Sequence, residues 1–111
     1  MRASSLPGTF SDADMGEYRR AWGRPEAMTT MLNWYRASLQ RPMDDWPEPR
    51  VTVPTTIIWG MKDFALRSVM AAESAAECAD VELIELPDNT HWVQHEAPDL
   101  VNETLITRFR S

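Results

Sequence analysis

The chain has 111 residues, 43% of them apolar and 25% charged, a composition that excludes collagenous and disordered classes and fits one modest domain at most. With 17 acidic and 11 basic residues, its formal net charge of −6 argues against nucleic acid or an anionic membrane surface as a partner. One cysteine allows no internal disulfide, no signal peptide is recognisable, and no apolar run approaches the roughly 20 residues that cross a bilayer, so we expect a soluble, cytoplasmic protein.

The first part of the chain begins with a loop and a helix. Residues 1–10 have no apolar period and are typical of a loop or a frayed chain end. Ser11 stands three residues before Asp14, an arrangement that can cap a helix start, so a helix over about 12–22 is expected to follow. Gly23 is placed to end this helix, because glycine readily leaves the helical conformation.

A second helix is expected after Pro25, which suits a first helical position. Apolar side chains recur there every three or four residues until Pro42 stops the pattern, which predicts a helix that forms a hairpin with the first one. The residues that carry this period are Met28, Met31, Leu32, Tyr35 and Leu39.

The composition changes between residues 41 and 54, where prolines alternate with acidic residues and no regular element can persist. We therefore expect the main boundary of the chain in this segment. The predicted organisation is a helical part over 1–41, a proline-rich linker over 42–54 and a part with strands over 55–111.

Strands and helices alternate in the last part. Residues 55–59 and 81–86 are rich in apolar and β-branched side chains and predict two strands, the first of them covered on both faces. Helices are expected over about 66–78 and from about 98 to 109, where apolar residues follow helical spacing. This order is typical of a parallel α/β sheet. Two strands are too few for such a sheet to stand alone, so we expect an incomplete one.

Chemically capable side chains follow both predicted strands. Ligands of open α/β sheets bind beyond the carboxyl ends of the strands, where Asp63 and His91 would lie in neighbouring loops. A carboxylate that accepts the Nδ1 proton of an imidazole fixes its tautomer and leaves Nε2 available as a general base. Plainer interpretations exist for both, because an Asp in such a loop commonly caps a helix and a lone His commonly packs or faces solvent.

His95 competes with His91 for the role of base. It lies beside Glu96 at the approach to the last helix, which favours a solvated or structural side chain. The four-residue spacing of the two histidines could suggest a metal. Because that segment is not expected to be helical and no third ligand is evident, no metal site is predicted, and no cofactor is implied.

Two segments of the last part resemble the C-terminal end of α/β-hydrolase enzymes. They are 53–66, with a Trp-Gly-x-Lys-Asp motif, and 86–98, with a His-Trp pair. On the helix before the linker, the Asn-Trp-Tyr-Arg motif at 33–36 resembles the cap domain of soluble epoxide hydrolases. The resemblance covers nearly the whole chain. It implies the C-terminal part of an α/β-hydrolase fold, with a helical cap hairpin followed by strand, helix, strand and helix.

The resemblance also implies roles for single residues. Asp63 matches the acid member of the catalytic triad, His91 matches the base, and Tyr35 matches one of two cap tyrosines that hydrogen-bond the epoxide oxygen. Trp34, Trp59 and Trp92 could line the substrate pocket. In that family an aspartate opens the epoxide to an ester, and water activated by the His–Asp pair hydrolyses it. The tyrosine hydroxyl stabilises the developing negative charge.

The chain departs from the family pattern in one respect. Its glycines stand only at positions 8, 16, 23 and 60, so it has neither a Gly-x-Asp-x-Gly nor a Gly-x-Ser-x-Gly nucleophile elbow. The oxyanion segment and the earlier strands are missing as well. The resemblance therefore implies a fragment or a truncated reading frame that is inactive alone. Its expected partners are a small hydrophobic epoxide and the missing N-terminal part of the hydrolase fold.

Other interpretations remain open. Asp63 and His91 would serve a haloalkane dehalogenase or an esterase equally well, whereas Tyr35 favours epoxide opening because an alkoxide needs a proton-like donor. An alternative from another class is a non-enzymatic interaction module, whose uncovered strand edge and apolar helix faces dock onto a partner chain. The same surfaces could make the chain self-associate.

Overall fold

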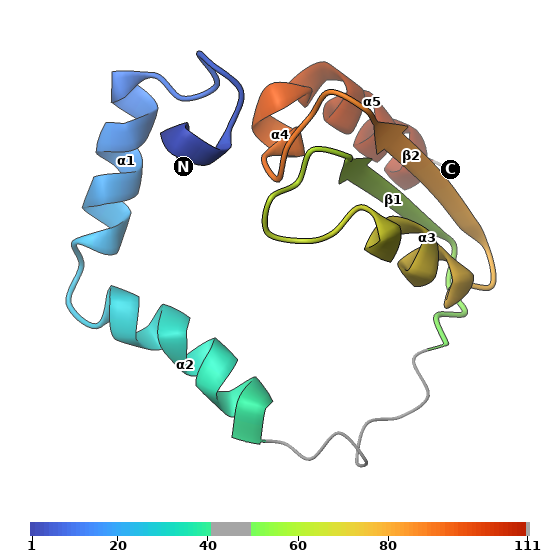
Figure 1. The fold of residues 1–111 in the computed structure, drawn as a ribbon, viewed down its shortest axis with the longest axis horizontal. Coiled ribbons are helices and arrows are strands. Elements are labelled where there is room, and N and C mark those ends of the chain that lie inside the picture. Colours follow the sequence, from blue (N-terminus) through green and yellow to red (C-terminus); the bar gives the residue numbers. More distant parts are fainter. Residues whose placement is uncertain (41–49, 111) are drawn as a thin grey trace. The chain divides into compact units, whose positions relative to one another are not determined.

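The computed structural model describes residues 1–40 and 50–110, which form two compact units (Figure 1). One unit comprises residues 1–9 and 50–110, and the other comprises residues 10–40. Most of the predicted linker over 42–54 lies outside the described residues. Residues 1–9 belong to the strand-containing unit, although they directly precede the two helices in the sequence.

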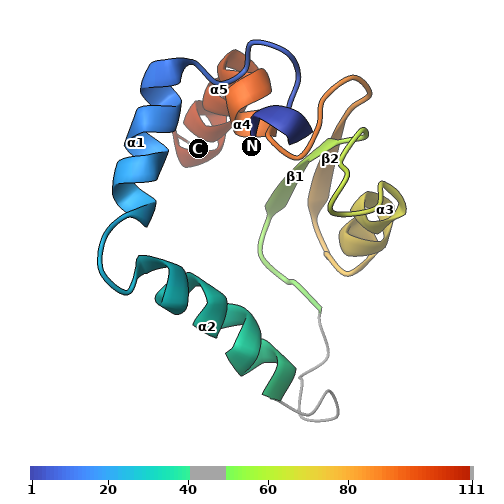
Figure 2. The ribbon, with the colours of Figure 1, turned by 60° about the vertical axis from the view of Figure 1, so that its left-hand side comes forward.

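The helical unit contains α1 (Asp12–Trp22) and α2 (Ala27–Gln40). A complete capping box starts α1: the Ser11 hydroxyl accepts a hydrogen bond from the Asp14 amide, and the Asp14 carboxylate accepts one from the Ser11 amide. The second helix starts later than Pro25 suggests, because Glu26 has a φ of 62°, a left-handed conformation that cannot continue a helix. Figures 1 and 2 show the two helices joined at this turn and diverging beyond it.

The apolar period of α2 produces a face that the described residues leave exposed. Side chains on this helix range from about half exposed to almost fully exposed: Met28, Met31, Leu32, Trp34, Tyr35 and Leu39. Phe10 differs, since it is 4% exposed and its ring packs edge to face against Tyr18. The apolar face that the sequence predicts for α2 therefore exists, but no other described element of this unit covers it.

The strand-containing unit is built on two parallel strands, β1 (Thr55–Gly60) and β2 (Val81–Leu86). Their register pairs Thr55 with Val81 and Gly60 with Leu86, so both strands end at the same edge. The sequence prediction of an incomplete parallel α/β sheet is confirmed. The strands are half-buried rather than fully covered, because only part of each face is packed.

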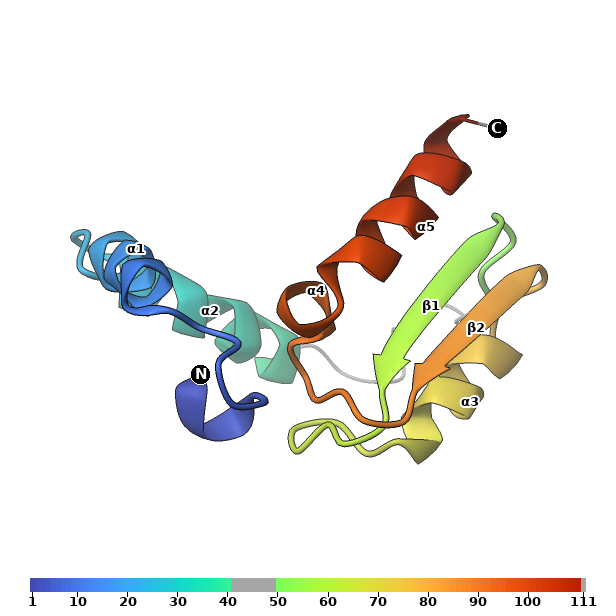
Figure 3. The ribbon, with the colours of Figure 1, turned by 90° about the horizontal axis from the view of Figure 1, so that it is seen from above.

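Helices lie on both faces of this small sheet, as Figures 2 and 3 show. The first, α3 (Val69–Ala76), contributes the fully buried Ala71. On the other face lies α5 (Pro98–Arg110), preceded by the short helix α4 (Val93–Glu96). The Arg108 guanidinium of α5 forms hydrogen bonds to both strands. Its Nε donates to the Thr56 hydroxyl of β1 at 2.6 Å, and its Nη2 donates to the Glu82 carboxylate of β2 at 3.1 Å.

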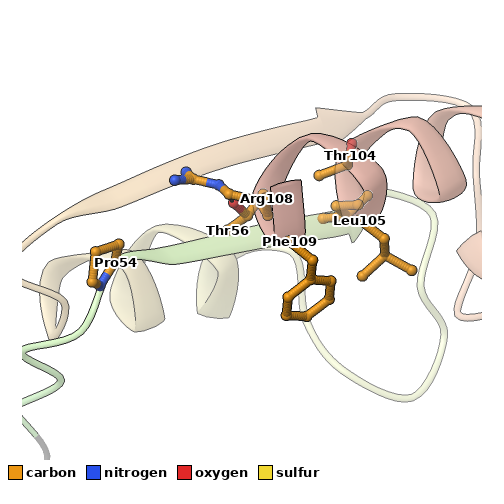
Figure 4. A pocket seen from close by; sticks show the side chains of 7 residues that line it. Pro54, Thr56, Thr104, Leu105, Arg108 and Phe109 are labelled. Carbon is orange, nitrogen blue, oxygen red and sulfur yellow. Dashed lines mark hydrogen bonds between the residues drawn. The ribbon is translucent and has the colours of Figure 1, made fainter. Parts of the chain in front are cut away.

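A hollow with a volume of about 390 Å³ lies between β1 and α5 (Figure 4). Figure 4 shows Leu105 and Phe109 projecting from the same side of α5, and the Phe109 side chain is largely exposed. This apolar hollow is not lined by Asp63 or His91. Its lining residues are Pro54, Thr56, Ile58, Thr104, Leu105, Arg108 and Phe109.

None of the helices over residues 1–40 and 50–110 has both the length and the apolarity that a membrane crossing requires. In the same residues, no group of three or more His, Cys, Asp or Glu side chains is arranged to hold a metal ion.

Candidate active site

Two loops meet at the edge where β1 and β2 end. Asp63 follows β1 in the first loop and His91 follows β2 in the second. The structure brings the two side chains together, with 2.8 Å between Asp63 Oδ2 and His91 Nδ1. Nε2 of His91 has no hydrogen-bond partner among the residues that the structure describes. An imidazole held in this way presents a bare Nε2, provided Nδ1 carries the proton, and can accept a proton there.

The loop itself holds the Asp63 carboxylate in place. Oδ1 accepts hydrogen bonds from the amides of Ala65 at 2.7 Å and Leu66 at 3.1 Å, which leaves Oδ2 directed at His91. The Asp63 side chain is 7% exposed, whereas that of His91 is 39% exposed. Partial burial alone would raise the pKa of Asp63, but the hydrogen bonds from His91, Leu66 and Ala65 lower it below the ordinary value.

These contacts bear on both interpretations of Asp63. Its carboxylate does bind backbone amides, as a capping residue would, but α3 begins only at Val69 and its N-cap is Ser68. The predicted helix over 66–78 is shorter because Asp63 binds the amides of the preceding turn in a non-helical arrangement. One carboxylate oxygen therefore orders the loop, and the other orients His91.

Acidification is expected to release His91 from Asp63. The folded-state pKa of Asp63 lies below its ordinary value of 3.8, so ionised Asp63 stabilises the fold above that value. The stabilisation is lost as the pH falls below 3.8 and through the lower folded-state pKa. Amide proton shifts of Ala65 and Leu66, followed by NMR, should titrate in this window. They should stay flat in Asp63→Asn, and a wild-type midpoint above 3.8 would contradict the prediction.

Backbone contacts join the two loops. The amide of Met61 donates to the Leu86 carbonyl and that of Lys62 to the Asn89 carbonyl, each at 2.9 Å. The Lys62 ammonium also pairs with the exposed Asp88 carboxylate at 2.7 Å. Gly60 lets the loops come this close, because a Cβ atom at that position would collide with the Thr90 carbonyl oxygen.

Glu96 is a site residue that the sequence analysis missed. Its Oε1 accepts hydrogen bonds from the Leu6 amide at 2.9 Å and the Thr90 hydroxyl at 2.7 Å, and its Oε2 accepts one from the Thr90 amide at 2.7 Å. Partial burial would raise the pKa of Glu96, but hydrogen bonds from Leu6, Thr90 and Asn89 lower it. No spacing rule reveals this role, since Leu6 lies 90 residues away in the sequence.

The remaining predicted site residues lie in different places. The Trp92 indole packs edge to face against the His91 ring, and its Nε1 donates to the Ser4 hydroxyl at 3.1 Å. Trp34 and Tyr35 belong to α2 in the other unit, where both side chains are largely exposed. The substrate contacts expected of these three residues remain predictions.

A small open hollow of about 170 Å³ adjoins the Asp63–His91 pair. Trp59 is one of its lining residues, and Trp59 Nε1 is buried without a hydrogen-bond partner among the described residues. The other lining residues are Ile58, Gly60, Leu66, Thr90 and Val93. Space for a reacting group therefore exists beside the pair, on the strand edge where ligands of α/β sheets bind.

The chain is similar to known proteins over two thirds or more of its length. No family model matches the chain. It is 38% identical over 103 residues to the AB hydrolase superfamily protein YfhM of Bacillus subtilis, a match that covers 93% of this chain and 36% of the relative. It is 39% identical over 75 residues to haloalkane dehalogenase 2 of Mycobacterium tuberculosis, covering 67% of this chain and 26% of that protein.

Epoxide hydrolases are also among the similar proteins. Epoxide hydrolase 2 of Caenorhabditis elegans is 31% identical over 93 residues, covering 84% of this chain and 26% of the relative. A crystal structure of an epoxide hydrolase from Bacillus megaterium aligns with a TM-score of 0.74 at 23% identity and covers 94% of this chain and 39% of that one. The chain thus spans roughly a third of the length of its relatives. It has the fold of the C-terminal portion of an α/β hydrolase, and its sequence relatives are α/β hydrolases, epoxide hydrolases and haloalkane dehalogenases.

Proposed function

We propose that this chain supplies the acid, the base and one cap tyrosine of a hydrolase that opens epoxides with water to give diols. The observation that carries the proposal is the 2.8 Å contact between Asp63 Oδ2 and His91 Nδ1, with Nε2 left available beside a hollow. The kinship with epoxide hydrolases over most of the chain supports the choice of reaction.

In the proposed reaction an aspartate outside this chain attacks an epoxide carbon, so that a C–O ester bond forms and the ring C–O bond breaks. The Tyr35 hydroxyl donates a hydrogen bond to the ring oxygen and stabilises its developing negative charge. Water then attacks the ester carbonyl and gives a proton to Nε2 of His91, while Asp63 stabilises the imidazolium that forms. When the tetrahedral intermediate collapses, the C–O ester bond breaks, and the two protons of the water, one of them held on Nε2, pass to the two alkoxide oxygens. The diol is released, and the aspartate and the neutral imidazole are regenerated.

The nucleophile must come from a complementary part of a hydrolase fold, and surface features support such a partner. The buried Nε1 of Trp59 lacks an acceptor among the described residues, and leaving such a donor unpaired costs about 1–3 kcal/mol. Exposed apolar side chains on α2 and α5 offer further area for association. The substrate proposed for the assembled enzyme is a small hydrophobic epoxide, which Trp34 and Trp92 would contact.

Dehalogenation is the second candidate, because a haloalkane dehalogenase is 39% identical over 75 residues. The two reactions share the ester intermediate but differ in the leaving group, since an alkoxide is a strong base that needs a proton-like donor such as a tyrosine hydroxyl, whereas a halide is a weak base that indole N–H groups can hold. Tyr35→Phe therefore separates them. In the chimera described below, this variant should lower epoxide turnover by about 100–1,000-fold, the cost of losing one donor to a developing oxyanion, and leave dehalogenation unchanged.

A chimera provides the test. This chain would replace the matching segment of the Caenorhabditis elegans epoxide hydrolase 2, whose aspartate elbow, expected by family resemblance, would complete the site. We expect the chimera to convert a styrene-oxide-type substrate to its diol and the isolated 111-residue chain to show no turnover. A folded chimera that is inactive while its parent is active would contradict the proposal. Turnover by the isolated chain would contradict it too.

A further inference from the structure

One carboxylate lies directly behind the loop that carries His91. Glu96 accepts hydrogen bonds from the amide and hydroxyl of Thr90 at 2.7 Å each and from the amide of Leu6 at 2.9 Å, and the Asn89 side chain is a further donor. Thr90 precedes His91 in the chain, and its hydroxyl oxygen also accepts the amide hydrogen of Trp92 at 3.4 Å. The residues on both sides of His91 are thus connected to a single acidic side chain.

The donor set suits an ionised carboxylate and no other side chain of similar shape. An ionised carboxylate only accepts hydrogen bonds, whereas the amide group of glutamine would direct an N–H group at one of these donors. Hydrogen bonds to a charged acceptor are about twice as strong as those between neutral groups. The lowered pKa of Glu96 agrees with the ionised form. Unlike Asp63, Glu96 does not contact the imidazole, so it acts on His91 only through the backbone.

We propose that Glu96 is a positioning residue, which clamps Thr90 and thereby holds the His91 ring in hydrogen-bond contact with Asp63. The N-terminal segment takes part in this arrangement, because the Leu6 amide is one of the donors to Glu96 and the Ser4 hydroxyl accepts a hydrogen bond from Trp92 Nε1. It rests on the proposed function in that His91 is taken to be the base. Of the two expectations for residues 1–10, a loop or a frayed end, these contacts favour an ordered loop around Ser4 and Leu6.

The test compares Glu96→Gln with the matched control Glu103→Gln, which changes an exposed glutamate on α5. NMR of the full chain in mildly alkaline solution measures the Nδ1–H tautomer of His91, and hydrogen exchange measures the Thr90 amide. We expect Glu96→Gln to weaken the Nδ1–H signal and to accelerate Thr90 exchange about 10- to 100-fold, with β1 and β2 amides unchanged. Glu103→Gln should match the wild type in both readouts.

A second variant covers the case in which Glu96→Gln fails to fold. Thr90→Val removes the hydroxyl donor with little change of shape, and it should weaken the Nδ1–H signal in the same direction. Wild-type tautomer and exchange in both Glu96→Gln and Thr90→Val would overturn the role of Glu96 alone. Absence of the Nδ1–H signature from the wild type would count against the proposed function, because the Asp63–His91 contact itself would then be missing.

Discussion

Replacing His91 with alanine in the active chimera is expected to lower epoxide turnover by about 10⁴–10⁶-fold, by analogy with the loss of the base from serine triads. The reason is that Nε2 of His91 accepts the proton of the water that hydrolyses the ester. Nucleophilic attack on the epoxide does not need this base, so the ester intermediate should accumulate. Intact-protein mass spectrometry after incubation with substrate should therefore show one added substrate mass per chain, together with a steady-state assay that detects almost no diol.

His95→Ala is the matched control for this prediction. His95 lies four residues further on, in α4, where its ring contacts Trp92 rather than Asp63. We expect this variant to keep turnover within a few-fold of the parent and to show no trapped ester. If His95→Ala were as inactive as His91→Ala, or if His91→Ala turned over normally, the base would have to be assigned elsewhere.

The proximity of Asp63 and His91 could be predicted from the sequence, because it follows from the topology of the sheet. The carboxyl ends of parallel strands lie at one edge, and the observed register ends β1 and β2 opposite each other at Gly60 and Leu86. Asp63 and His91 come shortly after these ends, so neighbouring loops bring them within reach of each other. The helix periods were similarly informative, since α1 and α5 begin and end close to their expected bounds.

Other features depend on contacts that no local pattern encodes. The hydrogen bond between the Leu6 amide and Glu96 joins residues 90 positions apart in the sequence. The turn before α3 is held by the Asp63 carboxylate, which also contacts His91. The late start of α2 follows from the left-handed backbone conformation of Glu26, which could not be predicted because glutamate rarely adopts it. The spacing of apolar residues along a helix also does not show which element packs on the apolar face. The apolar face of α2 remains exposed in the described structure.

Replacing Gly60 with alanine is expected to destabilise the strand-containing unit by about 1–3 kcal/mol, the usual cost of an overpacked site. The new Cβ would collide with the Thr90 carbonyl oxygen and lie 2.7 Å from that of Asn89. Both obstacles are backbone atoms, so no side-chain rotation relieves them. The loop that carries His91 must move instead, and the hydrogen bond from Lys62 to the Asn89 carbonyl is the first contact at risk. Urea unfolding followed by circular dichroism measures the loss of stability.

Gly16→Ala separates this effect from the general consequences of a glycine substitution. A Cβ at Gly16, within α1, meets nothing within 4 Å, so alanine there should stabilise the helix by roughly 0.5–1 kcal/mol. Gly60 has no left-handed φ, and its substitution therefore acts through the collision alone. Because that collision is with the residue directly before His91, Gly60→Ala should also weaken the Nδ1–H signal of His91. Wild-type stability with an intact signal would mean that the two loops are further apart than the structure places them.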